Sequence, residues 1–105
     1  MIGRTLIFTA AFTALTTVQA VAGCGALQSS PSKQTARVKF VNGNAGMVNV
    51  LWYKFKGGTK KYRSLAPAQS YMQSTFTNHV WAFTDVKGKC LSTYVVNGSG
   101  TYTIQ

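Results

Sequence analysis

Hydrophobic and polar residues alternate along short stretches of this chain. In "ARVKFV", Val38 and Phe40 share one face while Arg37 and Lys39 share the other, as a half-buried β-strand requires. Turn residues follow this run and separate it from further short apolar runs about every ten positions; these are "MVNVLWYKF", "YRSL", "HVWAFT", "LSTYVV" and "TYTI". Short strands punctuated by Gly, Asn and Pro predict an antiparallel β-sandwich or β-barrel.

Two of these runs are apolar on both faces. One face of residues 48–55 carries Val48, Val50 and Trp52, and the other carries Leu51, Tyr53 and Phe55. In residues 79–84, His79, Trp81 and Phe83 alternate with Val80 and Ala82. Strands that are apolar on both sides are covered on both sides, so we expect these two to be central or to line a cleft. No later stretch keeps the 3.6-residue period of an amphipathic helix.

Residues 1–23 have the pattern of an export signal. Arg4 is followed by an apolar run and then by small residues. The run ends in Val21-Ala22-Gly23-Cys24, which resembles the bacterial lipobox; this resemblance implies cleavage before Cys24 and a diacylglycerol on its sulfur. We expect a lipoprotein-type signal peptide and a mature protein anchored in a bacterial cell envelope. A retained transmembrane anchor is the alternative, since the run approaches the roughly 18 residues that begin to span a bilayer.

Cys24 has a second possible role. If an ordinary signal peptidase cut earlier, near Ala20 or Ala22, Cys24 and Cys90 would both survive in an oxidising compartment and could form a disulfide. The protein would then be secreted or periplasmic and soluble. With lipidation, Cys90 would instead be an unpaired, buried strand cysteine. Residues 24–35 are polar and contain one proline, which predicts a flexible tether and leaves residues 36–105 as the folded domain.

Composition limits both the architecture and the chemistry. The 105 residues have room for one domain, and eleven Lys and Arg residues stand against one carboxylate side chain, that of Asp85. This shortage of acids excludes paired-carboxylate hydrolases and makes carboxylate cages for calcium or magnesium improbable. With no metal-spaced His/Cys cluster and no phosphate-binding glycine motif in the sequence, we expect no metal and no cofactor.

Catalysis is not expected either. The only histidine, His79, and Asp85 stand six positions apart along one predicted strand. At about 3.3 Å per residue this separation is roughly 20 Å, too far for the hydrogen bond of a catalytic triad. No Gly-x-Ser-x-Gly nucleophile motif is present. We expect Asp85 to cap the turn that follows it.

The positive charge favours an anionic partner. Basic residues cluster around one predicted hairpin; these are Lys54, Lys56, Lys60, Lys61 and Arg63. Such a patch can hold a domain against anionic lipid, an acidic glycan or nucleic acid, and it defines an alternative function for the chain. Nucleic acid is the least expected of these partners.

One set of residues has a familiar spacing. It comprises "FVN" at 40–42, Trp52, Phe55, Tyr62, Leu65, Pro67, and "HVWAF" at 79–83 followed by Asp85. From Phe40 to Asp85 the chain resembles, without gaps, the β domain of the von Hippel-Lindau (VHL) tumour suppressor family, and the likeness continues loosely through "VVNGSGTYTI". The resemblance implies a seven-stranded antiparallel β-sandwich. It also implies a non-catalytic module that recognises 4-hydroxyproline in an extended peptide.

The resemblance further implies which residues form the pocket. The family builds it from two tryptophans, a tyrosine, a serine and a histidine, and the corresponding residues here are Trp52, Trp81, Tyr62, Thr75 and His79. Thr75 keeps the hydroxyl of the serine and adds a methyl group. Where a histidine and a tyrosine contact the peptide in the family, Ser74 and Phe76 stand here, so the preferred flanking sequence should differ. The family's helical domain, which docks elongin, has no counterpart in the sequence, so no ubiquitin-ligase partner is expected.

Overall fold

The computed structural model describes residues 23–105; the expected signal peptide falls almost wholly on residues 1–22, which lie outside the described residues. Seven strands follow one another: β1 (Thr35–Asn42), β2 (Val48–Tyr53), β3 (Thr59–Leu65), β4 (Ser70–Phe76), β5 (Val80–Thr84), β6 (Cys90–Val95) and β7 (Gly100–Ile104). Six of them overlap the predicted apolar runs, although β3 begins three residues before its run and β2 ends two residues before the end of its run. The seventh, β4, was not among those runs, because its inward residues include the polar Gln73 and Thr75, which weaken the alternation.

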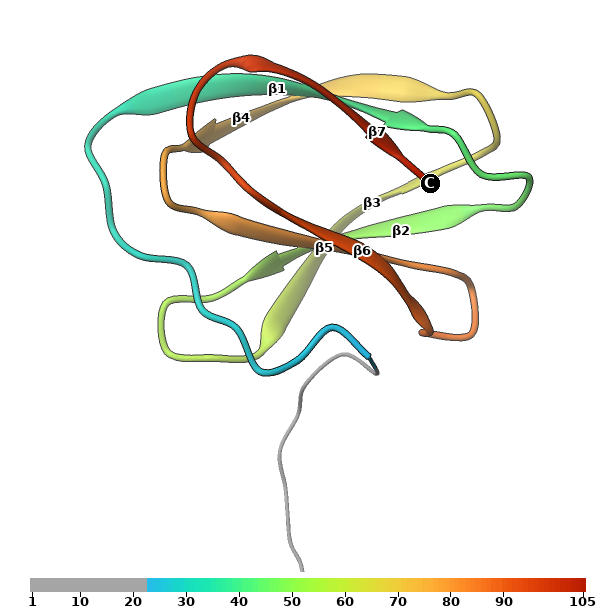
Figure 1. The fold of residues 1–105 in the computed structure, drawn as a ribbon, viewed down its shortest axis with the longest axis horizontal. Helices are drawn as coiled ribbons and strands as arrows, with labels where there is room; N and C mark the ends of the chain where they lie inside the picture. The colour runs from blue at the N-terminus through green and yellow to red at the C-terminus, as the bar shows by residue number, and fades with distance from the viewer. Residues whose placement is uncertain (1–22) are drawn as a thin grey trace, which may run out of the picture.

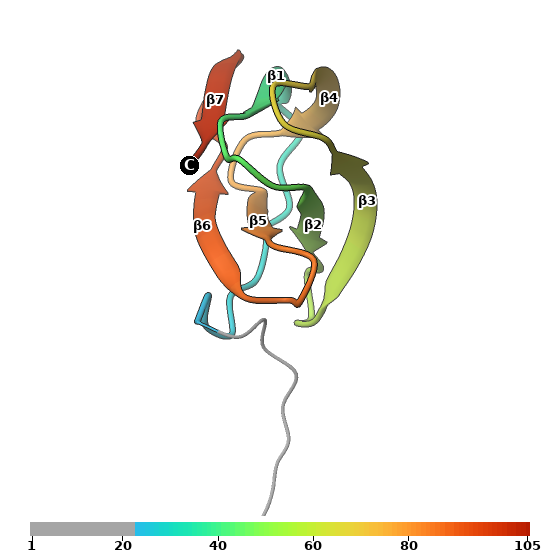
Figure 2. The same cartoon turned by 90° about the vertical axis from the view of Figure 1, so that its right-hand side faces the viewer.

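The strands form two sheets, with the orders β4-β1-β7 and β3-β2-β5-β6. The sheets pack face to face as two layers (Figures 1 and 2), which confirms the predicted β-sandwich. One pairing departs from the antiparallel expectation. β7 runs parallel to β1, from the pair Val38–Gly100 to the pair Asn42–Ile104. The chain reaches β7 by crossing from the four-stranded sheet to the other layer, so a tight hairpin does not set its direction.

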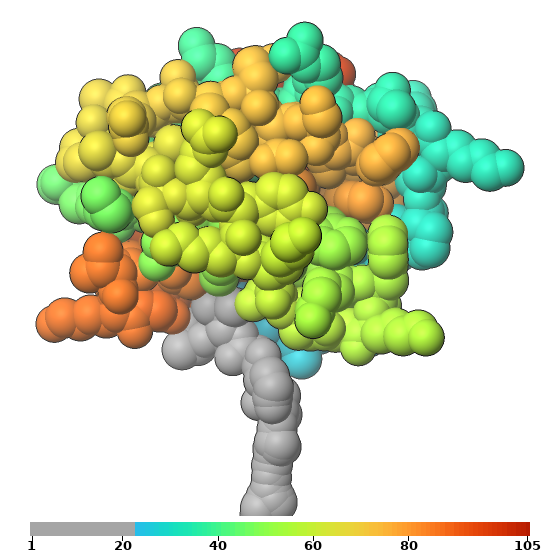
Figure 3. Space-filling view, turned by 180° about the vertical axis from the view of Figure 1, so that it is seen from behind, coloured from blue at the N-terminus to red at the C-terminus, as the bar shows by residue number. Residues whose placement is uncertain are grey.

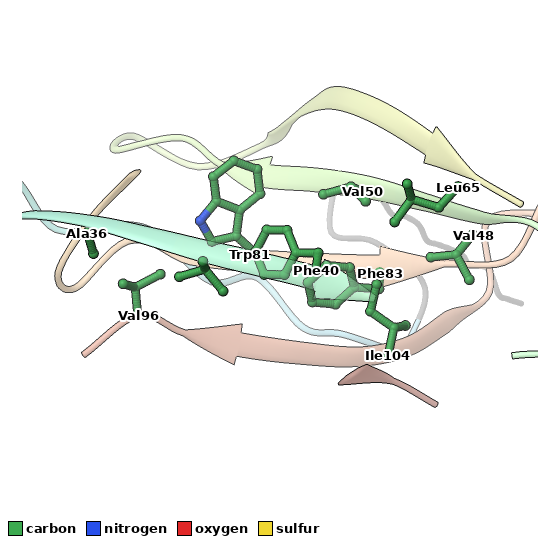
Figure 4. Close-up of a cluster of buried hydrophobic side chains, with 10 residues drawn as sticks. Ala36, Phe40, Val48, Val50, Leu65, Trp81, Phe83, Val96 and Ile104 are labelled. Atoms are coloured by element: carbon green, nitrogen blue, oxygen red, sulfur yellow. The ribbon is translucent and has the colours of Figure 1, made fainter. Parts of the chain in front are cut away.

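The core lies between the two layers and is built by the inward face of each strand. Its centre is the Phe40 ring, whose centroid is 5.0 Å from that of Phe83 and 5.5 Å from that of Trp81 (Figure 4). β2 and β5 are the two inner strands of the four-stranded sheet, which confirms the expectation drawn from their two apolar faces. Every residue of β5 is buried.

The N-terminal segment departs from its prediction. Residues 24–35 were expected to form a flexible tether, but the segment before β1 packs against the outer face of the four-stranded sheet, and Thr35 already belongs to β1. The hydroxyl of Ser29 is buried and accepts a hydrogen bond of 2.8 Å from the Val80 backbone N–H, and the Tyr53 hydroxyl donates to the Gly25 carbonyl at 2.7 Å. The polar composition that predicted a tether supplies the hydrogen-bonding groups that hold this segment in place.

Cys24 and Cys90 form a disulfide, with their Cα atoms 5.4 Å apart. The structure therefore contains the second of the two arrangements left open by the sequence. A sulfur bonded in a disulfide has no free valence for the thioether of a lipid anchor, so lipidation of Cys24 is incompatible with this form, as is an unpaired Cys90. Within residues 23–105 no helix is long and apolar enough to cross a bilayer.

Candidate functional site

A pocket of about 250 Å³ opens between the edges of the two sheets. β3 and β4 are edge strands that lie on the same side of the sandwich (Figure 2). Figure 3 shows the face that they form, with β3 in yellow and β4 in deeper yellow to orange. The lining residues are Trp52, Phe55, Tyr62, Ser74, Thr75, Phe76, His79 and Trp81. The structure thus brings together all five pocket residues inferred from the sequence and both of their flanking neighbours.

Aromatic rings form the walls of this pocket. Trp52 and Trp81 are directly paired on β2 and β5, so both indoles project from the same face of the sheet. The Tyr62 ring from β3 stands edge-on to Trp81, with the centroids 5.0 Å apart, and 6.5 Å from the Trp52 ring. Trp81 is almost completely buried, whereas Tyr62 is about half exposed at the mouth of the pocket.

A register shift in the β2–β3 pairing positions Tyr62. Leu51 pairs with Lys61 and Val50 pairs with Arg63, so Tyr62 is an extra residue on β3. Such a β-bulge bends the strand and re-aims a side chain. Here it leaves Tyr62 against the pocket while Arg63 lies over the Tyr71 ring of the opposite sheet, 4.3 Å from its centroid. The sequence alternation gave no sign of this bulge.

Phe55 is a pocket residue that the sequence reasoning did not assign to the site. Its ring centroid is 5.2 Å from that of Trp52 and 5.4 Å from that of His79, and its side chain is a little less than half exposed. A tight turn with positive φ at Gly57 (94°) and Gly58 (79°) carries it to this place. The sequence did contain a signal for this residue. Phe55 is an aromatic residue two positions after β2, a strand that is apolar on both faces.

Polar atoms meet at the base of the pocket. The Trp52 Nε1–H donates to His79 Nδ1 at 3.2 Å, and the Trp81 Nε1–H donates to Thr75 Oγ1 at 3.2 Å. Thr75 Oγ1 lies 3.5 Å from His79 Nδ1. Both indole donors are therefore satisfied within the pocket, as buried polar groups require. This network orients the imidazole and the hydroxyl without using all of their hydrogen-bonding capacity.

The network determines the state of the imidazole. Nδ1 accepts a hydrogen from Trp52, so in the neutral ring the proton is on Nε2, which is then a donor. Burial lowers the pKa of His79 from its ordinary value of 6.5, because the charged form loses hydration. His79 is accordingly neutral at pH 7. The Thr75 hydroxyl accepts from Trp81, and because Nδ1 carries no proton, the Thr75 hydrogen is the donor in its 3.5 Å contact with Nδ1. The second lone pair of Thr75 Oγ1 is left to accept a further hydrogen bond.

The turn between β4 and β5 holds His79 in position. Asn78 has a φ of 69°, a left-handed conformation that asparagine tolerates better than most residues. The turn is braced from two sides: the Val96 N–H donates to the His79 carbonyl at 2.9 Å, and the Ser30 N–H donates to the Asn78 carbonyl at 3.1 Å. The N-terminal segment thus supports the base of the pocket directly.

The five basic residues that cluster around the β2–β3 hairpin in the sequence do not form one surface. Lys60 is paired with Trp52, and its ammonium lies 5.3 Å from the centroid of the Tyr62 ring at the pocket mouth. Lys61 is paired with Leu51, whose side chain packs on the outer face of the sheet, so the register places Lys61 on that opposite face. Arg63 lies over the other sheet. Only Lys54, Lys56 and Lys60 remain near the pocket.

Asp85 belongs to another part of the molecule. Its carboxylate oxygen Oδ1 accepts the backbone N–H groups of Lys87 and Lys89, each at 2.9 Å, which confirms its predicted role as the cap of this turn. The whole of β5 separates Asp85 from His79. Residues 23–105 contain no group of three or more His, Cys, Asp or Glu side chains placed to hold a metal ion.

The fold and the pocket define a small β-sandwich domain with an aromatic pocket at its edge. The family model described as the VHL beta domain matches residues 27–104, and the chain belongs to this family. The likeness inferred from residues 40–85 is therefore confirmed, and the match extends it to nearly all of the described residues. No curated protein matches the chain.

Proposed function

We propose that the pocket binds the ring of 4-hydroxyproline in an extended peptide, and that the protein is a non-catalytic peptide-binding module. The observation that carries this proposal is the pocket itself: an aromatic recess with a neutral imidazole and a hydroxyl at its base. The VHL β domain binds hydroxyproline peptides, and membership of that family supports the same chemistry here.

The size and walls of the pocket suit one side chain. Its volume of about 250 Å³ lies below the range of roughly 300–1,000 Å³ found for pockets that enclose drug-sized ligands. Indole and phenol faces offer a pyrrolidine ring a large apolar contact at little conformational cost, because aromatic side chains have few rotatable bonds. A proline-type ring is itself rigid, so little entropy is lost when it enters.

The base of the pocket matches a ring hydroxyl. An alcohol oxygen can accept the Nε2–H of His79, and the alcohol O–H can donate to Thr75 Oγ1, which has a second lone pair beside the one that accepts from Trp81. An unmodified proline would displace water from these groups without replacing their hydrogen bonds. Each buried donor left unpaired costs about 1–3 kcal/mol, so the pocket should discriminate strongly against proline.

The same geometry argues for binding without catalysis. His79 is hydrogen-bonded to Trp52 and lies next to Thr75. The single carboxylate side chain of the sequence, Asp85, could not pair with His79, because it caps a distant turn. An imidazole without an acidic partner can orient a hydroxyl but lacks the third member of a triad. The site is therefore built to recognise its ligand and not to convert it.

We also propose that the protein acts outside the cytoplasm in its disulfide-bonded form. The export-type pattern of residues 1–23 and the Cys24–Cys90 disulfide both fit an oxidising compartment. The alternative function, in which five basic residues bind an anionic partner together, is less well supported. The strand register places Lys61 and Arg63 on faces other than that of the remaining three.

Calorimetric titration with paired peptides tests the proposed function. The peptides differ only in proline or 4-hydroxyproline, and the protein is compared with its His79→Ala variant. We expect the wild type to bind the hydroxylated peptide at least tenfold more tightly than its partner, since one lost hydrogen bond of about 1.4 kcal/mol has that effect. The variant should lose the preference. Equal binding of both peptides by the wild type across several flanking sequences would disprove the proposal.

A further inference from the structure

A second hollow adjoins the pocket. It has a volume of about 350 Å³ and is lined by Trp52, Lys54, Phe55, Lys56 and Gly57. Trp52 and Phe55 line both hollows, so the two hollows share a wall beside the β2–β3 hairpin. The first hollow is aromatic with a polar base, whereas the second combines two aromatic rings with two lysines.

The lysines beside this hollow have no acidic side chain to neutralise them. The chain contains one Asp or Glu residue, Asp85, and its Oδ1 accepts two backbone N–H groups of the β5–β6 turn. Lys54, Lys56 and Lys60 therefore concentrate positive charge beside the two hollows without an internal counter-charge. A concave surface lined by one sign of charge attracts ligands of the opposite sign.

The hairpin holds these residues in a defined place. The Lys54 N–H donates to the Gly58 carbonyl at 2.9 Å and the Gly57 N–H donates to the Lys54 carbonyl at 3.3 Å, closing the turn. A Cβ on Gly58 would lie 3.4 Å from Lys54 Cε, so the lysine stem already lies along the turn. The short turn thus fixes the backbone from which Lys54 extends beside the second hollow.

We propose that this second hollow is a subsite for acidic residues next to the residue held in the aromatic pocket. The inference rests on the proposed function, because it takes an extended peptide in the pocket as its starting point. An extended peptide advances about 3.3 Å per residue, so side chains close in sequence to the pocket residue lie beside a hollow that shares a wall with the pocket. The partner is an acidic peptide in which aspartate or glutamate accompanies hydroxyproline.

The test uses peptides that vary two features independently. Each carries proline or 4-hydroxyproline at one position, and aspartates or asparagines on either side of it. They are titrated into the oxidised protein, into a Lys54→Gln/Lys56→Gln variant, and into a Lys87→Gln/Lys89→Gln variant. The last is a matched control, since it removes the same charge from the β5–β6 turn, away from both hollows.

Aspartate peptides should bind the wild type about three- to tenfold more tightly than asparagine peptides, the range expected for one or two exposed ion pairs. This advantage should shrink with added salt, vanish in Lys54→Gln/Lys56→Gln and persist in Lys87→Gln/Lys89→Gln. The hydroxyproline preference should survive in both variants, because neither variant changes the aromatic pocket.

Other outcomes separate this inference from the proposed function. A hydroxyproline preference with no effect of aspartate overturns the subsite and leaves the proposed function intact. A lysine-dependent effect of aspartate without a hydroxyproline preference overturns the proposed hydroxyproline specificity, and the subsite next to a bound hydroxyproline with it, and leaves only a site for acidic peptides at the second hollow. Binding of anionic phosphatidylglycerol vesicles that depends on Lys54 and Lys56, with no effect of aspartate in peptides, would assign the hairpin to a membrane and contradict the subsite.

Discussion

The base and the rim of the pocket differ in how much of the fold depends on them. At the base, Trp81 is 2% exposed and His79 is 7% exposed, and Trp81 also belongs to the main core. At the rim, Tyr62, Phe55 and Phe76 are 45%, 43% and 37% exposed. The base is therefore part of the folded core as well as of the proposed binding site, while the rim lies largely outside the core and serves mainly the proposed binding.

This difference explains why the two regions require different experiments. A substitution at the base changes the free energy of unfolding as well as binding, so loss of binding alone cannot prove a contact with ligand. A substitution at the rim changes little besides the surface that meets the ligand, because exposed positions contribute little to stability. We expect the largest effects at the base.

Replacing Trp81 with alanine should have the largest effect. The change removes a buried indole that contacts Phe40 and leaves the Thr75 hydroxyl without its donor. We expect a loss of about 3–5 kcal/mol in the free energy of unfolding, measured by urea denaturation. Tyr62→Ala is the matched rim variant and should lose about 1 kcal/mol or less. Equal losses in the two variants would contradict the division between base and rim.

Removing the disulfide should have the next largest effect. Cys24 and Cys90 are 66 positions apart, and a cross-link of this span restricts the unfolded chain enough to contribute about 2–4 kcal/mol. We expect a Cys24→Ser/Cys90→Ser variant to lose this amount in urea denaturation. Reduction of the wild type should produce the same loss. Mass spectrometry showing a lipid on Cys24 of the isolated protein would instead contradict the disulfide.

At the rim, Phe55→Ala should weaken binding without weakening the fold. The ring lines both hollows, so its loss should reduce affinity for a hydroxyproline peptide about tenfold while the free energy of unfolding changes by no more than about 0.5 kcal/mol. Calorimetry and urea denaturation measure the two quantities. Val86→Ala removes another exposed apolar side chain, away from the pocket, and should change neither. Phe55→Ala binding like the wild type would remove Phe55 from the site.

The smallest expected effect concerns pH. Because burial lowers the pKa of His79 in the folded protein, the unfolded chain takes up a proton first as pH falls. Stability from this group is complete above the ordinary pKa of 6.5 and declines below it until the folded pKa is reached. A single proton limits the slope to about 1.4 kcal/mol per pH unit. Urea denaturation between pH 7 and pH 5 should show this decline, and His79→Gln, which does not titrate, should lack it.

The sequence predicted much of this architecture because the relevant signals are local. The two apolar faces of residues 48–55 and 79–84 identify β2 and β5 as inner strands, since only strands covered on both sides have that pattern. The five pocket residues were inferred because they match the positions of the pocket residues in the VHL β domain family. The structure brings all five together. Alternation alone would have marked Trp52 and Trp81 as core residues.

The features that the sequence missed depend on contacts between distant segments. The segment 24–34 has the composition of a tether, and only the positions of Val80 and Tyr53 show that its polar groups have partners. The β-bulge at Tyr62 leaves no mark on the alternation of β3. The choice between lipid and disulfide at Cys24 depended on whether Cys90 would lie within bonding range, which local pattern cannot indicate.

The central claim is that one pocket holds a hydroxylated proline ring between the two indoles. The chain has only two tryptophans, and both indole N–H groups lie in this pocket, so the two indole signals in a ¹⁵N–¹H NMR spectrum report on it directly. Titration with a 4-hydroxyproline peptide should shift both signals and reach saturation, whereas the matched proline peptide should leave them nearly unchanged at the same concentrations. Identical responses to the two peptides, or no shift with either, would contradict the claim.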